Sequence, residues 1–276
     1  MRLDFIKMHG LGNDFMVLDL PIDAALPSAA QWRALADRHT GIGFDQALVL
    51  QPPRRPGTDR YYRIFNADGG EVEQCGNGAR CVAALLQRRG GITDGELTLD
   101  SAGGLVRARV FADGRVAVDM GPPDFDPHSL PFDVPARSTR YAISVEGEMH
   151  EVGAVSMGNP HVVLRVATLE SALVQRVGHA LQSSPRFPRQ VNVGFVQIVD
   201  RGHIRLRVYE RGVGETLACG TGACAAVAVG RDLGLLDADV EVHVPGGTLS
   251  VHWGGADESV WLTGPAQQAF EGHVEI

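Results

Sequence analysis

The sequence predicts a mixed α/β fold (α+β) made of two pseudo-symmetric domains that arose by internal duplication. Residues 65–79 and 209–223 align without a gap, and each places a cysteine before Gly-x-Gly and an alanine-rich apolar run. Landmark pairs also recur in the same order at offsets of 143 to 146 residues: Asn13/Asn159, Gln46/Asn192, Asn66/Glu210, Cys75/Cys219, Gly103/Gly246 and Gly121/Gly264. Matches at a nearly constant period indicate a repeated unit, here one of strands and two helices.

We expect each domain to be a mostly antiparallel sheet wrapped around a central helix. The proline-rich segment 121–131 separates the halves, so we place the first domain at residues 1–120 and the second at residues 121–264. Both cysteine-bearing helices should point at the crevice between the domains. That crevice is therefore the expected active site.

In the first half, short apolar or alternating runs separated by glycine and proline predict strands. Ser28 and Gln31 form a capping-box signature, so a helix should run over 29–38. The first cysteine helix should run over 76–89, where two glycines end it. The expected strands are 5–8, 15–20, 44–50, 61–65, 97–100, 104–111 and 115–120.

The second half repeats this order of elements. A strand should end at Asn159, as one ends at Asn13 in the first half. A plain helix is expected over 168–182 and the second cysteine helix over 220–233. The expected strands are 191–198, 204–209, 240–244 and 248–253.

Length and charge argue against several classes of protein. The 276 residues carry a net charge of -8 with a pI near 5.7, which argues against a general nucleic-acid surface. No apolar run approaches the ~18–20 residues of a membrane span, and the N-terminus has no signal-peptide core. The cysteines should therefore stay reduced in a cytosol. We expect a cytoplasmic protein with no membrane or nucleic-acid partner.

Cys75 and Cys219 are the two candidate reactive groups. Each would stand at a helix N-terminus, where unpaired N–H groups and the helix dipole favour the thiolate and also bind a carboxylate. The glycines that follow would let a ligand approach the backbone closely. Cys81 and Cys224 lie inside helical runs, so we interpret them as core packing. We expect one reactive thiol to remove a proton from a bound carbon acid. The other would supply a proton on the opposite face, which inverts the stereocentre.

Metal and cofactor chemistry fit the sequence less well. The spacings Cys75-x5-Cys81 and Cys219-x4-Cys224 lie outside, or at the edge of, those of structural zinc pairs. Neither glycine turn has the lysine and serine or threonine of a phosphate loop. Pyridoxal phosphate would need a lysine, and the only lysine, Lys7, stands in the first strand without a partner motif. We expect no metal and no cofactor.

Polar residues beside the same turns are candidates for ligand recognition. Arg211 is suited to a second carboxylate. His161 and Glu210 are titratable groups that could exchange protons with the thiols or be structural. Short amides stand on turns or strand ends in both halves, where each alone could be a turn residue: Asn13, Asn66, Asn77, Asn159 and Asn192.

These motifs together resemble diaminopimelate epimerases over essentially the whole chain. The matching segments are 7–15, 65–69, 75–81, 158–161, 209–212 and 218–222. The resemblance implies interconversion of LL- and meso-2,6-diaminopimelate without a cofactor, on the route to lysine and peptidoglycan. Cys75 and Cys219 would be the acid/base thiols, and His161 and Glu210 would support proton transfer. The residues that would bind the substrate are Asn13, Gln46, Asn66, Gly76, Asn77, Asn159, Asn192, Glu210, Arg211, Gly220 and Thr221.

The resemblance also implies a homodimer and a tail, 265–276, that returns to the first domain. The tail holds Phe270 where the family often has tyrosine. Proline and hydroxyproline racemases are the main alternative, since they use two cysteines in a similar design. Arg211 and the amides suit a substrate with a second amino-acid head better. Phenazine-type isomerases share the fold but replace the thiols. A non-enzymatic alternative is a metal-stabilised binding module, which would hold zinc.

Overall fold

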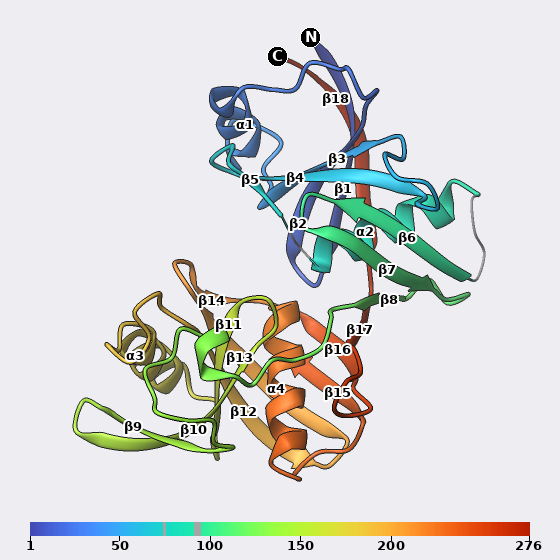
Figure 1. Ribbon diagram of the computed structural model, residues 1–276. Helices are drawn as coiled ribbons and strands as arrows, with labels where there is room; N and C mark the ends of the chain where they lie inside the picture. Colours follow the sequence, from blue (N-terminus) through green and yellow to red (C-terminus); the bar gives the residue numbers. More distant parts are fainter. Residues whose placement is uncertain (74–75, 91–94) are drawn as a thin grey trace. The chain divides into compact units, whose positions relative to one another are not determined.

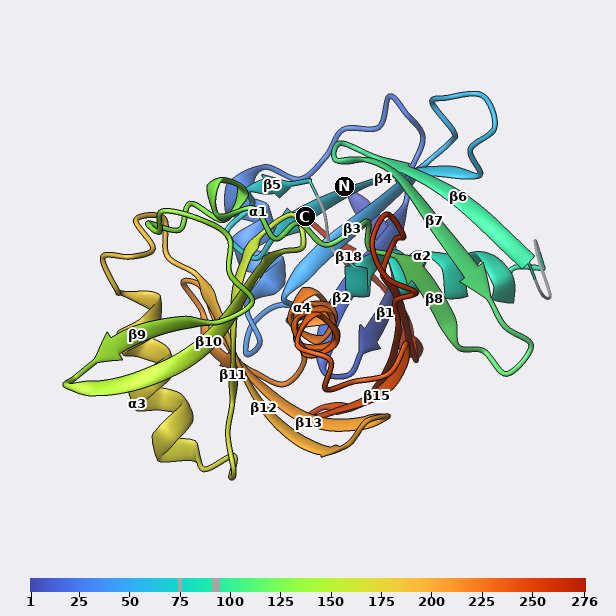
Figure 2. The same cartoon turned by 60° about the horizontal axis from the view of Figure 1, so that its bottom comes forward.

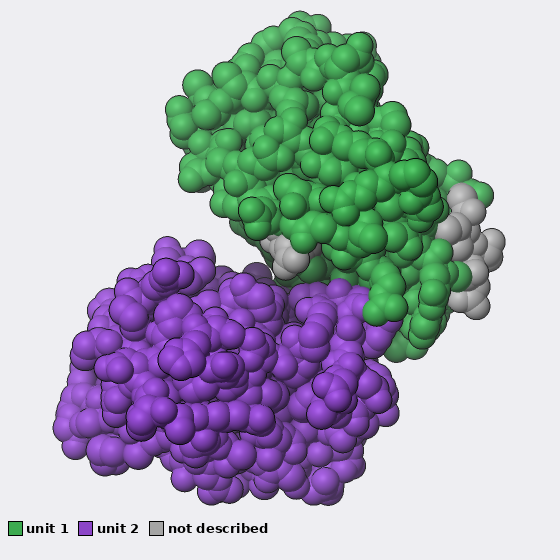
Figure 3. All heavy atoms as spheres, in the orientation of Figure 1, with its two compact units in different colours: residues 1–118, 264–276 green, residues 119–263 purple. Residues whose placement is uncertain are grey.

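The computed structural model describes residues 1–73, 76–90 and 95–276, and the chain forms two compact units (Figure 1). Unit 1 comprises Met1–Val118 and Gly264–Ile276, and unit 2 comprises Asp119–Thr263 (Figure 3). Both units consist mainly of strands, with two α-helices each in the described residues.

Unit 1 is a mixed sheet with two helices. Its elements are β1 (Arg2–Gly10), β2 (Asn13–Asp19), α1 (Ala29–Ala36), β3 (Gln46–Gln51), β4 (Arg60–Asn66), β5 (Glu71–Val72), α2 (Gly76–Arg88), β6 (Gly95–Ser101), β7 (Gly104–Val110), β8 (Val116–Asp119) and β18 (Gln267–Glu275). The strand order is β18, β1, β2, β3, β4, β6, β7, β8, and the short β5 pairs with β4. The pairs β2–β3 and β4–β6 are parallel, and the others are antiparallel.

Unit 2 is built in the same way. Its elements are a 3-10 turn η1 (Pro127–Ser129), β9 (Tyr141–Val145), β10 (Glu148–Ser156), β11 (Pro160–Arg165), α3 (Ser171–Gln182), β12 (Asn192–Asp200), β13 (His203–Glu210), β14 (Gly214–Thr216), α4 (Gly220–Asp232), β15 (Asp239–Val244), β16 (Gly247–His252) and β17 (Trp261–Gly264). The strand order is β9, β10, β11, β12, β13, β15, β16, β17, and the short β14 pairs with β13. The pairs β11–β12 and β13–β15 are parallel.

The two sheets therefore have the same strand order and the same strand directions. This confirms the mixed α/β fold and the internal duplication. The units differ at one edge: β18, from the end of the chain, pairs with β1, whereas β9, from the preceding hairpin, pairs with β10. One repeat thus takes its edge strand from the far end of the sequence.

The cysteine helix of unit 2 lies at the centre of its sheet. Figure 2 views α4 nearly end-on, with β10 to β13 and β15 curving around it. Nearly every residue of α4 from Gly220 to Gly230 is buried. Glycine in the sheet lets the helix approach closely, because a Cβ on Gly153 would lie only 2.2 Å from Cγ1 of Val229.

The plain helices pack through their own apolar clusters. In unit 1, Trp32 of α1 stacks on Phe65 with ring centroids 5.2 Å apart. In unit 2, Val177 and Leu181 of α3 join a buried cluster with Phe195 of β12. Each unit therefore has a core of its own. No helix in the described part of the chain is long and apolar enough to cross a membrane.

The structure corrects two helix boundaries. The predicted helix 29–38 begins as expected with the Ser28–Gln31 capping box but ends at Ala36, because Asp37 is extended and its carboxylate accepts the N–H groups of His39 and Thr40. The helix predicted over 168–182 begins only at Ser171, since Glu170 is extended. The sequence analysis did not predict the β9–β10 hairpin. In the structure its turn residues, Glu146 and Gly147, have the positive φ angles typical of tight hairpins.

Candidate active site

Cys219 is the N-cap residue of α4. Its backbone is extended (φ -119°, ψ 109°), and its Sγ accepts a hydrogen bond of 3.4 Å from the N–H of Gly222. A Cβ on Gly222 would lie 3.2 Å from Sγ and 2.9 Å from Cγ2 of Val208, so glycine is needed for this approach. The thiol therefore stands at the helix N-terminus, where the sequence predicts it.

The thiol of Cys219 is buried, with 5% of the residue exposed. Burial raises the pKa of the thiol, and the charge of Glu210 and its hydrogen bond to the thiol raise it further. Hydrogen bonds from Thr221 and Gly222 lower the pKa but offset only part of this. At Cys219, desolvation of the buried sulfur outweighs the preference of a helix N-terminus for a thiolate. The surroundings of Cys219 therefore favour the protonated thiol.

Glu210, the last residue of β13, is held at both its side chain and its backbone. Oε1 accepts a hydrogen bond from the hydroxyl group of Thr216 in β14. The backbone oxygen accepts one of 3.0 Å from Nε2 of Gln182, a buried residue of α3. A carboxylate fixed against a thiol in this way can take up or return the thiol proton.

His161 is linked to Cys219 by a chain of polar contacts through two other side chains. Its Nε2 lies 2.9 Å from Oδ1 of Asn159, whose Nδ2 donates a hydrogen bond of 3.3 Å to Oγ1 of Thr221. That hydroxyl oxygen lies 3.6 Å from Sγ of Cys219. Burial, together with the charge of Arg211, lowers the pKa of His161 to about 3. The imidazole is therefore neutral near pH 7.

The tautomer of His161 follows from its partner. An amide oxygen only accepts hydrogen bonds, so Nε2 carries the proton and Nδ1 holds a lone pair. Nδ1 is buried and has no hydrogen-bond partner within the described residues. Nδ1 is thus a buried hydrogen-bond acceptor.

Asn192 and Arg211 lie at the neighbouring strand ends of unit 2. Asn192 is buried; its Nδ2 donates a hydrogen bond of 3.0 Å to the backbone oxygen of Pro160, and its Oδ1 accepts one of 2.9 Å from the N–H of Arg211. The side chain of Arg211 donates a hydrogen bond of 3.3 Å to the backbone oxygen of Arg189. The amide of Asn192 thus ties three strand ends together and fixes the start of the Arg211 turn.

The candidate residues of unit 1 form a second set around the start of α2. Gln46 and Asn66 are register partners of β3 and β4, and Nε2 of Gln46 donates a hydrogen bond of 2.8 Å to Oδ1 of Asn66. Nδ2 of Asn77 donates one of 3.1 Å to Oδ1 of Asn13, and Nη2 of Arg80 donates one of 2.7 Å to Oδ1 of Asn77. The set thus contains two hydrogen-bonded pairs of amides, Gln46–Asn66 and Asn13–Asn77.

Cys75 lies outside the described residues, so its place is not assigned. Gly76 is the first described residue of α2, and Asn77 is buried in its first turn. Gly220 and Thr221 hold the corresponding places at the start of α4. Both helix N-termini thus have the backbone N–H groups that bind carboxylates.

Comparison with known proteins gives this arrangement a family. A profile of the family described as diaminopimelate epimerase matches residues 5–125 and 153–269. The chain belongs to the diaminopimelate epimerase family. A diaminopimelate epimerase from Thioalkalivibrio sulfidiphilus is 54% identical over 281 residues, and one from Azotobacter vinelandii is 51% identical over 276 residues. Each match covers 100% of both chains.

Solved structures of other activities share the fold of this family. A hydroxyproline epimerase from Agrobacterium vitis matches with a TM-score of 0.69 at 19% identity, over 99% of this chain and 92% of that one. A phenazine biosynthesis protein of the PhzF family from Bacillus anthracis matches with a TM-score of 0.68 at 18% identity, over 100% of both chains. At such low identity the likeness shows the fold alone.

Several residues around the candidate site of this family member were missed by the sequence analysis. Thr216 holds Glu210, Gln182 holds its backbone, and Asp45 accepts a hydrogen bond of 2.9 Å from Nδ2 of Asn13. Only Asp45 had a usable signal, since it directly precedes Gln46. Gln182 contacts Glu210 from α3, 28 positions away, and Thr216 contacts it from β14 of the same hairpin, so neither was marked by a motif of its own.

Other features of the described residues offer no competing site. Within the ranges that the structure covers, no group of three or more His, Cys, Asp or Glu side chains is placed to hold a metal. A cavity of about 610 Å³ in unit 2 is lined by residues that include Arg137, Asp232 and Trp253. Asp232 ends α4, twelve positions and roughly 18 Å along the helix from its start. The cavity is therefore separate from the surroundings of Cys219.

Proposed function

We propose that this protein is a cofactor-independent epimerase that interconverts LL- and meso-2,6-diaminopimelate, on the route to lysine and peptidoglycan. Membership of the diaminopimelate epimerase family supports diaminopimelate as the substrate. The observation that carries the chemistry is the position of the Cys219 thiol, which caps the N-terminus of α4 and contacts the carboxylate of Glu210.

The proposed reaction uses two thiols and balances without a further reactant. The thiolate of Cys75 takes the α-proton from one face of the substrate carbon, and the thiol of Cys219 gives its proton to the opposite face. Cys75 then carries a proton and Cys219 is a thiolate, so the same pair runs the reverse reaction. N–H groups at the helix starts, at Gly76 and Gly220, would bind the substrate carboxylate and stabilise the carbanion.

His161 and Glu210 support these proton transfers in the proposal. After turnover Cys219 is a thiolate and Cys75 carries the extra proton, so Glu210 would relay a proton to the Cys219 sulfur when the pair is reset, because the carboxylate already contacts that sulfur. The neutral His161 would orient the Cys219 thiol for proton transfer through Asn159 and Thr221. Both roles place the titratable groups beside the reacting sulfur rather than on the substrate.

The remaining candidates would bind the substrate. Arg211 is exposed and would pair with the carboxylate of the distal amino-acid head. The amides would accept from ammonium groups and donate to carboxylates: Asn13, Gln46, Asn66, Asn77, Asn159 and Asn192. Thr221 would add its backbone N–H. A small amino acid would thus be the partner, and we further propose a cytoplasmic homodimer without membrane or nucleic-acid partners.

The test is a side-by-side assay of LL-diaminopimelate, proline and hydroxyproline in D2O without added cofactor. We expect deuterium at the α-carbon of diaminopimelate together with inversion, and neither with the two imino acids. Inversion of proline or hydroxyproline alone would assign the protein to the racemase alternative. No inversion of any of them would refute the proposal.

A further inference from the structure

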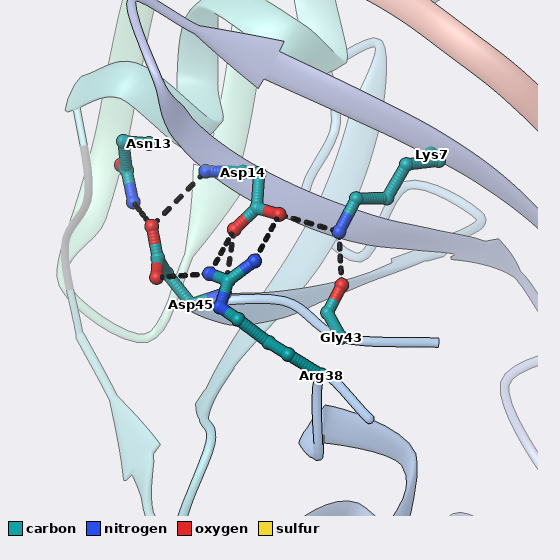
Figure 4. Close-up of polar contacts among 6 residues, drawn as sticks. All are labelled: Lys7, Asn13, Asp14, Arg38, Gly43 and Asp45. Atoms are coloured by element: carbon teal, nitrogen blue, oxygen red, sulfur yellow. Dashed lines mark hydrogen bonds and ion pairs between the residues drawn. The ribbon is translucent and has the colours of Figure 1, made fainter. Parts of the chain in front are cut away.

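A compact ionic cluster in unit 1 holds one of the candidate substrate-binding amides. We call it the Asp14–Asp45 cluster; Figure 4 shows its members converging beside the start of β2. They are Lys7, Asn13, Asp14, Arg38, Gly43 and Asp45. Apart from Asn13, none of them has a role in the proposed reaction.

Arg38 clamps two carboxylates at once. Its Nη1 and Nη2 donate hydrogen bonds of 2.9 and 2.8 Å to the two oxygens of Asp14, and Nη2 also donates one of 2.7 Å to Oδ1 of Asp45. The carboxylates also tie the backbones to each other. The N–H of Asp45 donates to Asp14 at 3.0 Å, and the N–H of Asp14 donates to Asp45 at 3.1 Å. Bidentate ion pairs of this kind fix geometry as well as charge.

The inner part of the cluster is a nearly buried ion pair. The side chains of Lys7 and Asp14 are 10% and 15% exposed, and Nζ of Lys7 lies 2.5 Å from Oδ2 of Asp14. Burial alone would raise the pKa of Asp14, but Arg38 and Lys7 outweigh it and lower the pKa to about 2. Lys7 also donates to the backbone oxygen of Gly43. The only lysine of the chain thus has a structural place.

The loop before β3 is shaped to keep Asp45 in position. Gly43 has a φ of +72°, and a Cβ there would lie 3.0 Å from Cα of Arg38. Asp45 then directly precedes Gln46, whose register partner in the parallel pair β2–β3 is Phe15. The cluster therefore joins the starts of the two strands from which Asn13 and Gln46 emerge.

The contact of Asp45 with Asn13 determines how the amide is turned. A carboxylate only accepts hydrogen bonds, so the NH2 group of Asn13 must face Asp45, at 2.9 Å. Oδ1 of Asn13 then faces the other way and accepts a hydrogen bond of 3.1 Å from Nδ2 of Asn77, at the start of α2. A carbonyl oxygen has two lone pairs, so a second acceptor position remains on Oδ1.

We propose that Asp45, held by Arg38, is a positioning residue that turns the Asn13 amide so that its Oδ1 accepts a hydrogen bond from the ammonium group of the substrate. This inference rests on the proposed epimerase function. Without a carboxylate at position 45, only the hydrogen bond from Asn77 would hold the amide in this orientation, and an amide that turned over would present NH2 to the ammonium group.

The test is a double-mutant cycle of Asp45→Asn and Asn13→Ala, read on kcat and KM for diaminopimelate and on Kd by calorimetry. We expect Asp45→Asn to raise KM and Kd about tenfold, with kcat changed less than about threefold, because a ground-state contact is lost. In the Asn13→Ala background the same change should alter KM less than about twofold, since the positioned group is gone. Equal effects in both backgrounds would overturn the proposal.

The control variant is Glu96→Gln, which removes an exposed ion pair of 2.6 Å with Arg109 in the same unit. It should leave KM unchanged, and a rise like that of Asp45→Asn would assign the effect to general loss of charge. Should Asp45→Asn fail to fold, Arg38→Gln replaces it in the cycle, since it withdraws the clamp and leaves Asp45 in place. Wild-type protein that binds diaminopimelate without turnover refutes the epimerase function, while the Kd cycle still decides the role of Asp45. Wild-type protein that binds no diaminopimelate overturns both.

Discussion

The two units have one topology but different chemistry at equivalent strand ends. In the parallel pair of unit 1, Phe15 lies opposite Gln46, and in unit 2 His161 lies opposite Asn192. Glu210 ends β13 where Asn66 ends β4. At these positions unit 2 holds an imidazole and a carboxyl group, whereas unit 1 holds a phenyl ring and an amide. Equivalent places in a duplicated fold thus do not hold the same chemistry.

The amides that lead into the strands are held by different means. In unit 1, Asn13 donates to the Asp14–Asp45 cluster. In unit 2, Asn159 contacts His161 and Thr221 instead, next to Cys219. The amide is oriented by an ionic cluster in one unit and by the groups beside the thiol in the other.

One feature is the same in both units and lies in the hairpin before each cysteine. Arg63 holds Glu71 with two hydrogen bonds of 2.7 Å across β4 and β5. Arg207 holds Glu215 with hydrogen bonds of 2.5 and 2.7 Å across β13 and β14. Both units keep this arginine–glutamate pair in the hairpin, while the residues at the equivalent strand ends differ.

The largest effect is expected for the thiols themselves. Cys219→Ala should lower kcat by about 1,000-fold or more, because an acid/base group that touches the substrate is removed. Cys224→Ala is the matched control, since Cys224 is buried in the same helix and should be needed only for packing. Steady-state assays of both variants decide this. Turnover near that of wild type in Cys219→Ala would contradict the two-thiol reaction. Cys75→Ala should behave like Cys219→Ala.

A smaller effect is expected from neutralising the carboxylate of unit 2. Glu210→Gln should lower kcat about 100-fold. It should also lower the pKa of Cys219, because the charge of Glu210 raises it in the wild type. The thiolate absorbance of the variant in a pH titration, with Cys219→Ala as the blank, should therefore appear at lower pH. An unchanged titration would place Glu210 away from the thiol.

A still smaller loss of kcat is expected when a residue of unit 2 is replaced by its counterpart from unit 1. Thr216 corresponds to Val72 at the offset of 144 residues that also relates Cys219 to Cys75. The hydroxyl group of Thr216 donates a hydrogen bond to Glu210. Thr216→Val should lower kcat about tenfold with KM nearly unchanged, since an oriented acid/base group is loosened. Val72→Thr is the control and should leave both constants as they are. Equal losses in the two variants would contradict a role specific to unit 2.

Much of the fold and part of the candidate site could be predicted from the sequence. The remaining features could not, because they depend on packing between distant residues. Cys219 and its helix follow from a local pattern, as do the strands that deliver Gln46 and Asn192. The state of the Cys219 thiol was not predictable, because burial depends on the packed sheet around α4. The Asp14–Asp45 cluster joins residues that are up to 38 positions apart in the sequence, from Lys7 to Asp45, and only Asn13 among them has a match in the second half.

The smallest expected effect concerns stability in acid. The folded state lowers the pKa of Asp14 from 3.8 to about 2. Its contribution to stability is therefore fully present above pH 4 and is lost as the pH falls toward 2. Asp14→Asn should lower the free energy of unfolding by about 1 kcal/mol at pH 6, a value reduced by solvent screening, and by less at pH 3. Urea unfolding at both pH values measures this, and a constant difference would contradict the assignment.

The claim that two thiols serve opposite faces of one carbon is tested most directly by deuterium exchange in single-serine variants. Cys75→Ser and Cys219→Ser would each be incubated in D2O with LL- and with meso-diaminopimelate, and label at the α-carbon would be followed by NMR. We predict that each variant labels only one stereoisomer, and that the two variants label opposite ones, because the intact thiol still serves its own face. Equal label in both stereoisomers with either variant would contradict the claim.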